Sequence, residues 1–236
     1  MVQAVERAFA VLEMFDADTP TLSAGEIAAR TGLARPTTYR LLQTLQRLGY
    51  VRHVDGGYEV THRVLRLGSG YLGQEGFPRR AQQVVDALTG EVGEHSAAAV
   101  LDDGEVLAVA AAHSPHSRYL SVAVRVGQRL PAATTALGRV LLAYGGEEQP
   151  VAGPEGGDAG LTAEDRETIV RCGFAVVDGL LESGLVSIGV PVRDRSGRVA
   201  AALSVAGNSG RVTVTSLERD VLPHLLRAAA ELQRLD

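Results

Sequence analysis

The chain has 236 residues, is 45% hydrophobic and 22% charged, and carries a formal charge of −5. This composition excludes an intrinsically disordered chain, and its apolar runs are too short to cross a bilayer. Glu6, Glu13 and Asp16 interrupt the apolar pattern of the first residues, unlike a secretory signal. We therefore expect a cytoplasmic protein of two domains with no membrane partner.

The basic residues and the cysteine limit the functions further. All 23 basic side chains are arginine, and residues 1–75 hold eight arginines against eight carboxylates, a net charge of zero. Charge alone therefore gives weak support for nucleic-acid binding, which has to rest on geometry. Cys172 is the only cysteine, which excludes an internal disulfide and any zinc site built from several cysteines.

Three helices are predicted in the first 49 residues. The first covers residues 3–15, with an apolar face formed by Val5, Ala8, Leu12 and Phe15. Ser23 and Glu26 have the spacing of a capping box, so a second, short helix begins there and ends at Gly32. Pro36 suits the first turn of a third helix, which ends at Gly49.

The third helix is predicted to have a buried and an outward face. The buried stripe consists of Leu41, Leu42, Leu45 and Leu48. The outward face consists of Thr37, Thr38, Arg40, Gln43, Thr44 and Arg47. The sequence "YVRHVDGGYEV", residues 50–60, then predicts two short strands around a tight glycine turn. Three helices and a hairpin of this size form a winged helix-turn-helix.

We interpret the third helix and the hairpin as a surface for double-stranded operator DNA. The first turn of the helix is placed for base edges, and Arg40, Arg52 and His53 are placed for phosphates. The predicted DNA-binding residues are Arg35, Pro36, Thr37, Thr38, Arg40, Thr44, Arg52 and His53. The alternatives are a simply solvated helix face, and a winged helix that docks a protein.

Residues 62–76 predict a linker helix, weakened by its glycines. It separates a DNA-binding domain, residues 1–61, from a second domain, residues 77–236. Helices of the second domain are predicted at residues 77–93, 134–144, 161–173 and 216–235, the last with a kink or later start at Pro223. Strands are predicted at residues 96–112 (two), 119–127, 174–178, 185–194 and 198–207. Residues 145–160 are a loop, and the domain as a whole is α+β.

Five blocks of the sequence resemble the IclR family of bacterial transcriptional regulators. They are "VERAFAVLEMF", "LSAGEIAARTGLARPTTYRLLQTLQRLGYV", "YEVTHRVLRLG", "RVGQRLPAATTALGRVLLA" and "SIGVPVRDRSGRVAAALSVAG". The resemblance implies a winged helix-turn-helix joined by a linker helix to a GAF/profilin-like effector-binding domain, assembled as a homodimer or tetramer. The chain departs from the family twice: Ala34 replaces a frequent serine cap, and residues 145–160 are shorter and richer in glycine.

The resemblance also implies where an effector binds. In the family, the effector lies against the helix start after the "LPA" segment and against the inward faces of the last strands. The implied effector-binding residues are Thr135, Ala136, Leu137, Ser187 and Ser204. The unpaired N–H groups of that helix start suit the carboxylate of a small organic acid. Alternatively, both serines bond to nearby backbone, and their apolar neighbours are plain core: Ile188, Val190, Leu203 and Val205.

No set of residues predicts catalysis, a cofactor or a metal site. His113 and His116 are three positions apart, but a metal ion needs a third ligand, and such a pair is more often solvated. No activating motif surrounds Ser114, Ser117 or Cys172. We expect a regulator whose operator binding responds to a small organic acid. An enzyme with an accessory winged helix and a winged-helix protein-interaction module are the alternatives.

Overall fold

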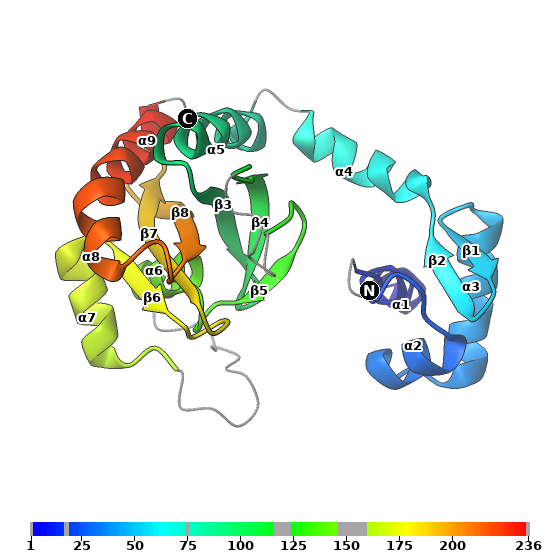
Figure 1. The fold of residues 1–236 in the computed structure, drawn as a ribbon. Helices are drawn as coiled ribbons and strands as arrows, with labels where there is room; N and C mark the ends of the chain where they lie inside the picture. Colours follow the sequence, from blue (N-terminus) through cyan, green and yellow to red (C-terminus); the bar gives the residue numbers. More distant parts are fainter. Residues whose placement is uncertain (1, 17–18, 74–75, 116–123, 146–159, 235–236) are drawn as a thin grey trace. The chain divides into compact units, whose positions relative to one another are not determined.

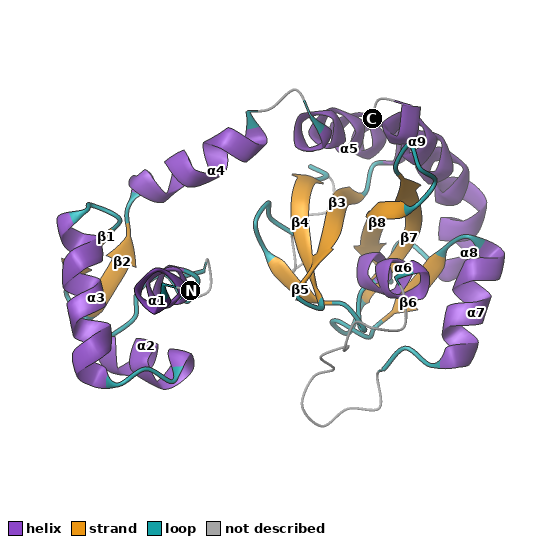
Figure 2. Ribbon diagram, turned by 180° about the vertical axis from the view of Figure 1, so that it is seen from behind, coloured by secondary structure: helices purple, strands orange, loops and turns teal. Residues whose placement is uncertain are grey.

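The computed structural model describes residues 2–16, 19–73, 76–115, 124–145 and 160–234. The chain divides into two compact units, Met1–Gly73 and Gln74–Asp236. Figure 1 shows the elements of both units as ribbons, and Figure 2 shows them from behind.

The first unit is a winged helix-turn-helix. Its helices are α1 (Gln3–Leu12), α2 (Ala24–Thr31) and α3 (Arg35–Arg47), and its wing is the antiparallel hairpin of β1 (Val51–Val54) and β2 (Gly57–Val60). A 3-10 turn, η1 (His62–Val64), and helix α4 (Leu65–Leu72) follow. The predicted order of three helices and a hairpin is confirmed.

Local signals in the sequence fix the ends of α2 and the turn of the wing. Ser23 Oγ accepts the Glu26 N–H at 3.2 Å, and a Glu26 carboxylate oxygen accepts the Ser23 N–H at 2.8 Å. Gly32 ends the helix in the left-handed region, with φ 68°. In the wing, a Cβ on Gly57 would overlap the Leu22 carbonyl, so only glycine lets the hairpin approach this segment.

The buried face of α1 differs from the predicted one. Val5 is 53% exposed, whereas Val11 is fully buried against Ile27 and Leu42. The helix also ends at Leu12 rather than at residue 15. The apolar residues of α1 outline more than one face, and only packing against α2 and α3 decides which of them is buried.

The second unit is a six-stranded antiparallel sheet with helices on both faces, which confirms the predicted α+β class. The strands are β3 (His95–Asp102), β4 (Glu105–Ala112), β5 (Arg129–Pro131), β6 (Ala175–Asp178), β7 (Leu185–Arg193) and β8 (Val199–Asn208), in the order β5-β4-β3-β8-β7-β6. The helices are α5 (Phe77–Val92), α6 (Ala136–Tyr144), α7 (Ala163–Cys172), α8 (Val214–Ser216) and α9 (Leu222–Arg234).

Alternate residues of β7 and β8 point to opposite faces of the sheet. Ile188 and Leu203 are fully buried in the core that α5 and α9 cover. Gly189 and Ser204, which pair with each other across the two strands, face α6. Helices α5 and α9 lie side by side in Figure 1, and α6 lies in front of the sheet in Figure 2. In β7 and β8, the face under α6 is the one that carries Ser187 and Ser204.

Of the strand predicted at residues 119–127, residues 119–123 lie outside the described part of the chain. The remaining residues, 124–127, are not in a strand, and the Gln128 N–H closes a turn on the Arg125 carbonyl at 3.0 Å. Gly127 takes φ 85°, and its N–H donates to the Ala108 carbonyl at 2.8 Å. The Ala108 N–H donates in turn to the Gln128 carbonyl at 3.0 Å, and the pairing with β4 continues through β5. Most of the loop predicted at residues 145–160 also lies outside the described residues.

The closing helical segment begins before the predicted Ser216. Thr213 caps α8 by accepting the Ser216 N–H, and a π-helical turn, η2 (Leu217–Val221), joins α8 to α9. Pro223 follows that turn directly. Because proline has no N–H to donate, the wider turn accommodates it where a kink was predicted.

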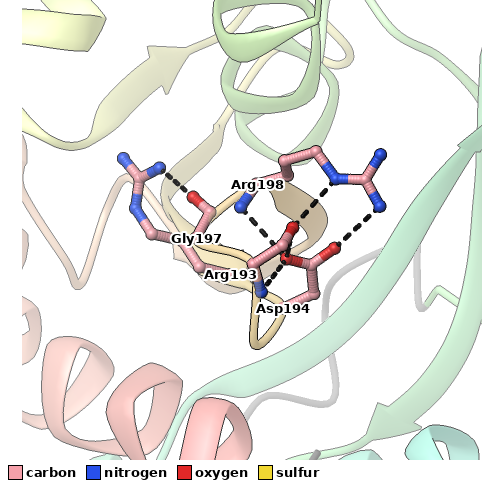
Figure 3. Close-up of polar contacts among 5 residues, drawn as sticks. Arg193, Asp194, Gly197 and Arg198 are labelled. Carbon is pink, nitrogen blue, oxygen red and sulfur yellow. Dashed lines mark hydrogen bonds and ion pairs between the residues drawn. The ribbon is translucent and has the colours of Figure 1, made fainter.

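Asp194 closes the turn between β7 and β8 (Figure 3). Its Oδ1 accepts the N–H groups of Ser196, at 2.8 Å, and Arg198, at 3.1 Å. The Ser196 hydroxyl also donates to Asp194, and this bond contributes most to holding the pKa of the carboxyl below its usual range. Arg193 donates to the Gly197 carbonyl at 2.8 Å. The turn thus fixes the register of the two strands that carry Ser187 and Ser204.

Candidate functional site

Helix α3 exposes a polar stripe along one side. Most of its exposed residues recur every three or four positions, the spacing of one helix face: Arg35, Pro36, Tyr39, Arg40, Gln43, Thr44 and Arg47. Gln46 is also exposed. The stripe holds four of the residues predicted for DNA, while Thr37 lies half-buried at its edge. Tyr39 was not predicted, although a large aromatic residue that is 50% exposed beside Arg40 is a signal for a binding surface.

Thr38 is buried, and its predicted outward orientation is wrong. It is 0% exposed and lies four and seven positions before the buried Leu42 and Leu45. Its hydroxyl donates to the Ala34 carbonyl at 3.4 Å, so burial does not leave it unpartnered. Leu48, predicted to be buried, is 48% exposed. The buried stripe is therefore rotated from the predicted one, and Thr38 has no free side for a base.

The start of α3 has no side-chain cap. Ala34 occupies the N-cap position, where no side-chain hydrogen bond is found, and the helix begins with Arg35. A Cβ placed on Gly25 would lie 3.9 Å from Arg35 Nη2, so this guanidinium lies close to the start of α2. Pro36 has no N–H, and the Thr37 N–H donates to the Ala34 carbonyl at 2.9 Å, so the backbone offers few free donors here. The helix dipole still places partial positive charge at this end.

The wing arginine is already paired within the protein. Arg52 Nη2 lies 2.8 Å from Glu59 Oε2 across the hairpin, and Nε donates to the same oxygen at 3.2 Å. The Arg52 side chain nevertheless remains 67% exposed. Its hydrogen bond lowers the pKa of Glu59, and a second bond from Thr21 lowers it further. His53 is also exposed and makes an edge contact with the Tyr58 ring.

The second unit contains an open cavity beside α6. It is lined by Val124, Leu130, Thr134, Thr135, Ala136, Leu137, Val177, Leu181, Leu185, Ser187, Ser204 and Ala206. All five residues implied for effector binding therefore line one cavity. Thr134 was not among them. Most of the lining is apolar, and the polar side chains among the described lining residues carry hydroxyl groups.

Two glycines bring the first turn of α6 to this place. A Cβ on Gly138 would overlap the backbone of Ala132, and a Cβ on Gly189 would lie 2.9 Å from the Ala136 carbonyl oxygen. Thr135 caps the helix, because its Oγ1 accepts the Gly138 N–H at 3.0 Å and donates to the Pro131 carbonyl at 3.1 Å. The helix start is thus clamped against the sheet, and its first N–H groups adjoin the cavity.

The histidines in the second unit form no metal site in the described residues. The His95 and His113 rings lie 5.6 Å apart, and burial followed by the His95 charge lowers the pKa of His113. His116 lies outside the described residues. No group of three or more metal-ligating side chains occurs in the described part of the chain.

None of the helices that the structure describes is both long enough and apolar enough to span a membrane.

Comparison with known proteins covers both units. The family model of the IclR helix-turn-helix domain matches residues 4–55, and that of the bacterial transcriptional regulator IclR C-terminal region matches residues 70–152 and 161–234. A Pca regulon regulatory protein of Pseudomonas putida is 35% identical over 96% of this chain and 81% of its own length. A p-hydroxybenzoate hydroxylase transcriptional activator of Acinetobacter baylyi is 34% identical over 99% of this chain and 92% of its own length.

A solved structure extends the likeness to a ligand complex. The crystal structure of an IclR homologue from Microbacterium hydrocarbonoxydans, complexed with 4-hydroxybenzoate, has a TM-score of 0.75 and 27% identity and covers 98% of both chains. The family models match most of the chain, and the first unit has the winged helix-turn-helix that the first model describes. The chain therefore belongs to the IclR family and is a DNA-binding transcriptional regulator.

Proposed function

We propose that this regulator responds to a small aromatic carboxylic acid bound in the cavity beside α6. The main support is that the start of α6, held against the backbone at Gly138, adjoins a mostly apolar cavity whose polar side chains carry hydroxyl groups. The helix start suits a carboxylate and the apolar walls suit a ring. The relatives named for p-hydroxybenzoate and crystallised with 4-hydroxybenzoate support this class.

The effector assignment is tested with fluorescence-labelled operator DNA. Adding 4-hydroxybenzoate or a related aromatic acid changes the anisotropy of the complex, because the acid binds the DNA-competent and incompetent states with different affinities. Glycerol, which has no carboxylate, serves as the control. Indifference to every carboxylic acid in a broad panel contradicts the proposal.

We propose that the first turn of α3 reads base edges through Arg35, while Arg40 contacts a phosphate. Pro36, Thr37 and Thr44 line the same surface, and the Thr44 hydroxyl donates to the Arg40 carbonyl at 2.9 Å. Arg52 and His53 on the wing contact the backbone. Arg40→Ala weakens all duplexes alike and reduces the slope of log affinity against log salt by about one. Arg171→Ala, an exposed arginine of the second unit, is the control.

We propose that the protein acts as a homodimer, or as a tetramer of two dimers, because one winged helix contacts too few base pairs to select a site. Helix α4 exposes four large apolar residues suited to a partner: Leu65, Leu67, Tyr71 and Leu72. Sedimentation velocity measures the assembly. Leu65→Glu, a residue 71% exposed, lowers the dimer fraction, whereas Val170→Glu on α7 leaves it unchanged. A monomer at micromolar concentration contradicts this proposal.

We further propose that the cavity binds without catalysis and that the protein works in the cytoplasm, where its operator lies. Hydroxyl groups without an adjacent general base supply no activated nucleophile. Recovery of the unchanged acid after prolonged incubation, measured by chromatography, is the expected result.

A further inference from the structure

Thr134, which lines the cavity, has a hydroxyl group with no hydrogen-bond partner among the residues that the structure describes. Thr134 is 5% exposed, and its Oγ1 is buried without a hydrogen bond to any described residue. Buried hydroxyls are normally hydrogen-bonded, and leaving one without a partner lowers stability. An unsatisfied hydroxyl in the lining of a cavity therefore calls for an explanation, which a ligand can provide.

The adjacent threonine shows that this position is unusual. The Thr135 hydroxyl gives its proton to the Pro131 carbonyl and accepts the Gly138 N–H, so it is committed to capping α6. Thr134 comes one position earlier and lines the same cavity. Of the two neighbouring hydroxyls at the start of α6, Thr134 is the one that retains a proton for a ligand.

The helix start points to the kind of ligand atom that takes this proton. Ala136 and Leu137 form the first turn of α6 and line the cavity, and N–H groups in a first turn have no partner within the helix. Together with the helix dipole they favour a negative charge. A carboxylate there has oxygen atoms enough to accept these groups and one hydroxyl.

Resting on the proposed function, we propose that Thr134 is a specificity-determining residue. Its hydroxyl donates to the carboxylate of the bound acid at the start of α6. The ring of the acid then lies among the apolar side chains of the cavity. Effector binding satisfies a group that the ligand-free protein leaves unsatisfied, so the hydroxyl that strengthens binding weakens the empty protein.

Replacing this hydroxyl by a methyl group has two effects of opposite sign. Thr134→Val keeps the shape of the side chain and removes the unsatisfied oxygen, so the full-length, ligand-free protein melts about 2 to 4 °C higher. The same change removes a hydrogen bond to a charged group, so binding weakens about 10-fold or more. Replacing a residue that only packs in the cavity wall does not raise the melting temperature while weakening ligand binding.

The experiment measures the melting temperature by calorimetry and the Kd by titration, with 4-hydroxybenzoate and benzoate as ligands. Thr134→Val is compared with the wild type and with Thr134→Ser, which keeps the hydroxyl. We expect Thr134→Val to melt higher and to bind both acids about 10-fold more weakly, and Thr134→Ser to stay within about threefold of the wild type.

Each of the other possible results contradicts a different part of the proposal. If the wild type binds an acid and Thr134→Val binds it equally well, Thr134 is not a specificity residue, although the proposed function stands. If only 4-hydroxybenzoate binding weakens, the hydroxyl meets the phenol and the carboxylate assignment is wrong. A lower melting temperature for ligand-free Thr134→Val contradicts an unsatisfied hydroxyl. A wild type that binds no carboxylic acid overturns the proposed function and this inference together.

Discussion

Helices α3 and α6 both begin at a proposed binding surface, but their first turns are held in different ways. The start of α3 follows Ala34, which offers no cap, and its first-turn side chains are mostly exposed. The start of α6 is capped by Thr135 and pressed against backbone at Gly138. An exposed start lets long side chains reach into a groove, whereas a clamped start fixes its N–H groups for a small ligand.

The largest expected effect lies at the clamped start. Gly138→Ala places a Cβ in overlap with the Ala132 backbone and lowers the free energy of unfolding of the second unit by about 3 kcal/mol. Denaturant titration measures it. Gly90→Ala in α5 is the matched control, because a Cβ there meets nothing within 4 Å and stabilises the helix by about 0.5 to 1 kcal/mol. Equal stability of both variants would show that α6 is not clamped.

At the open start, the effect concerns recognition rather than stability. Arg35→Ala reduces discrimination at the base pair it contacts by about 1 to 3 kcal/mol and leaves unfolding almost unchanged, since the side chain is exposed. Binding to operators with single base changes, measured at one salt concentration, checks it. If affinity falls by the same factor for every operator, Arg35 contacts the backbone instead.

The missing cap of α3 can be supplied. Ala34→Ser offers an oxygen to the first-turn N–H groups and raises the free energy of unfolding of the winged helix by about 1 kcal/mol. Ser23→Ala, which removes the cap of α2, lowers it by a similar amount. No gain from Ala34→Ser in thermal unfolding would show that another group already satisfies the start of α3.

The smallest effect distinguishes two buried threonines. Thr38→Val removes only a long hydrogen bond to the Ala34 carbonyl, so we expect less than about 1 kcal/mol of lost stability and unchanged operator discrimination. Thr134→Val, by contrast, is expected to stabilise the empty protein. A loss of operator discrimination in Thr38→Val would restore the predicted role of Thr38 in reading bases.

Features set by neighbouring residues could be predicted from the sequence. The capping box at Ser23, the glycine turn of the wing and the alternation of β7 and β8 depend on local geometry. The cavity-lining positions of Ser187 and Ser204 came from the family resemblance. The local features and the family resemblance can both be recognised from short motifs in a single sequence.

Features set by packing between elements could not be predicted. Thr38 and Leu48 exchange places in the buried stripe because the hairpin and α2 determine which side of α3 is covered. Val11 replaces Val5 in α1 for the same reason. Thr134 escaped notice because a hydroxyl without a partner is a property of its surroundings in the folded unit.

The ion pair between Arg52 and Glu59 affects how strongly DNA binding by the wing would depend on salt concentration. Unpaired arginine side chains that contact DNA phosphates displace condensed counterions. The affinity they contribute therefore falls steeply as the salt concentration rises. A guanidinium that already carries its own carboxylate brings little net charge to the duplex and releases few such ions. In the proposed complex, the wing orients the protein on its operator while adding little to the dependence of operator occupancy on salt concentration.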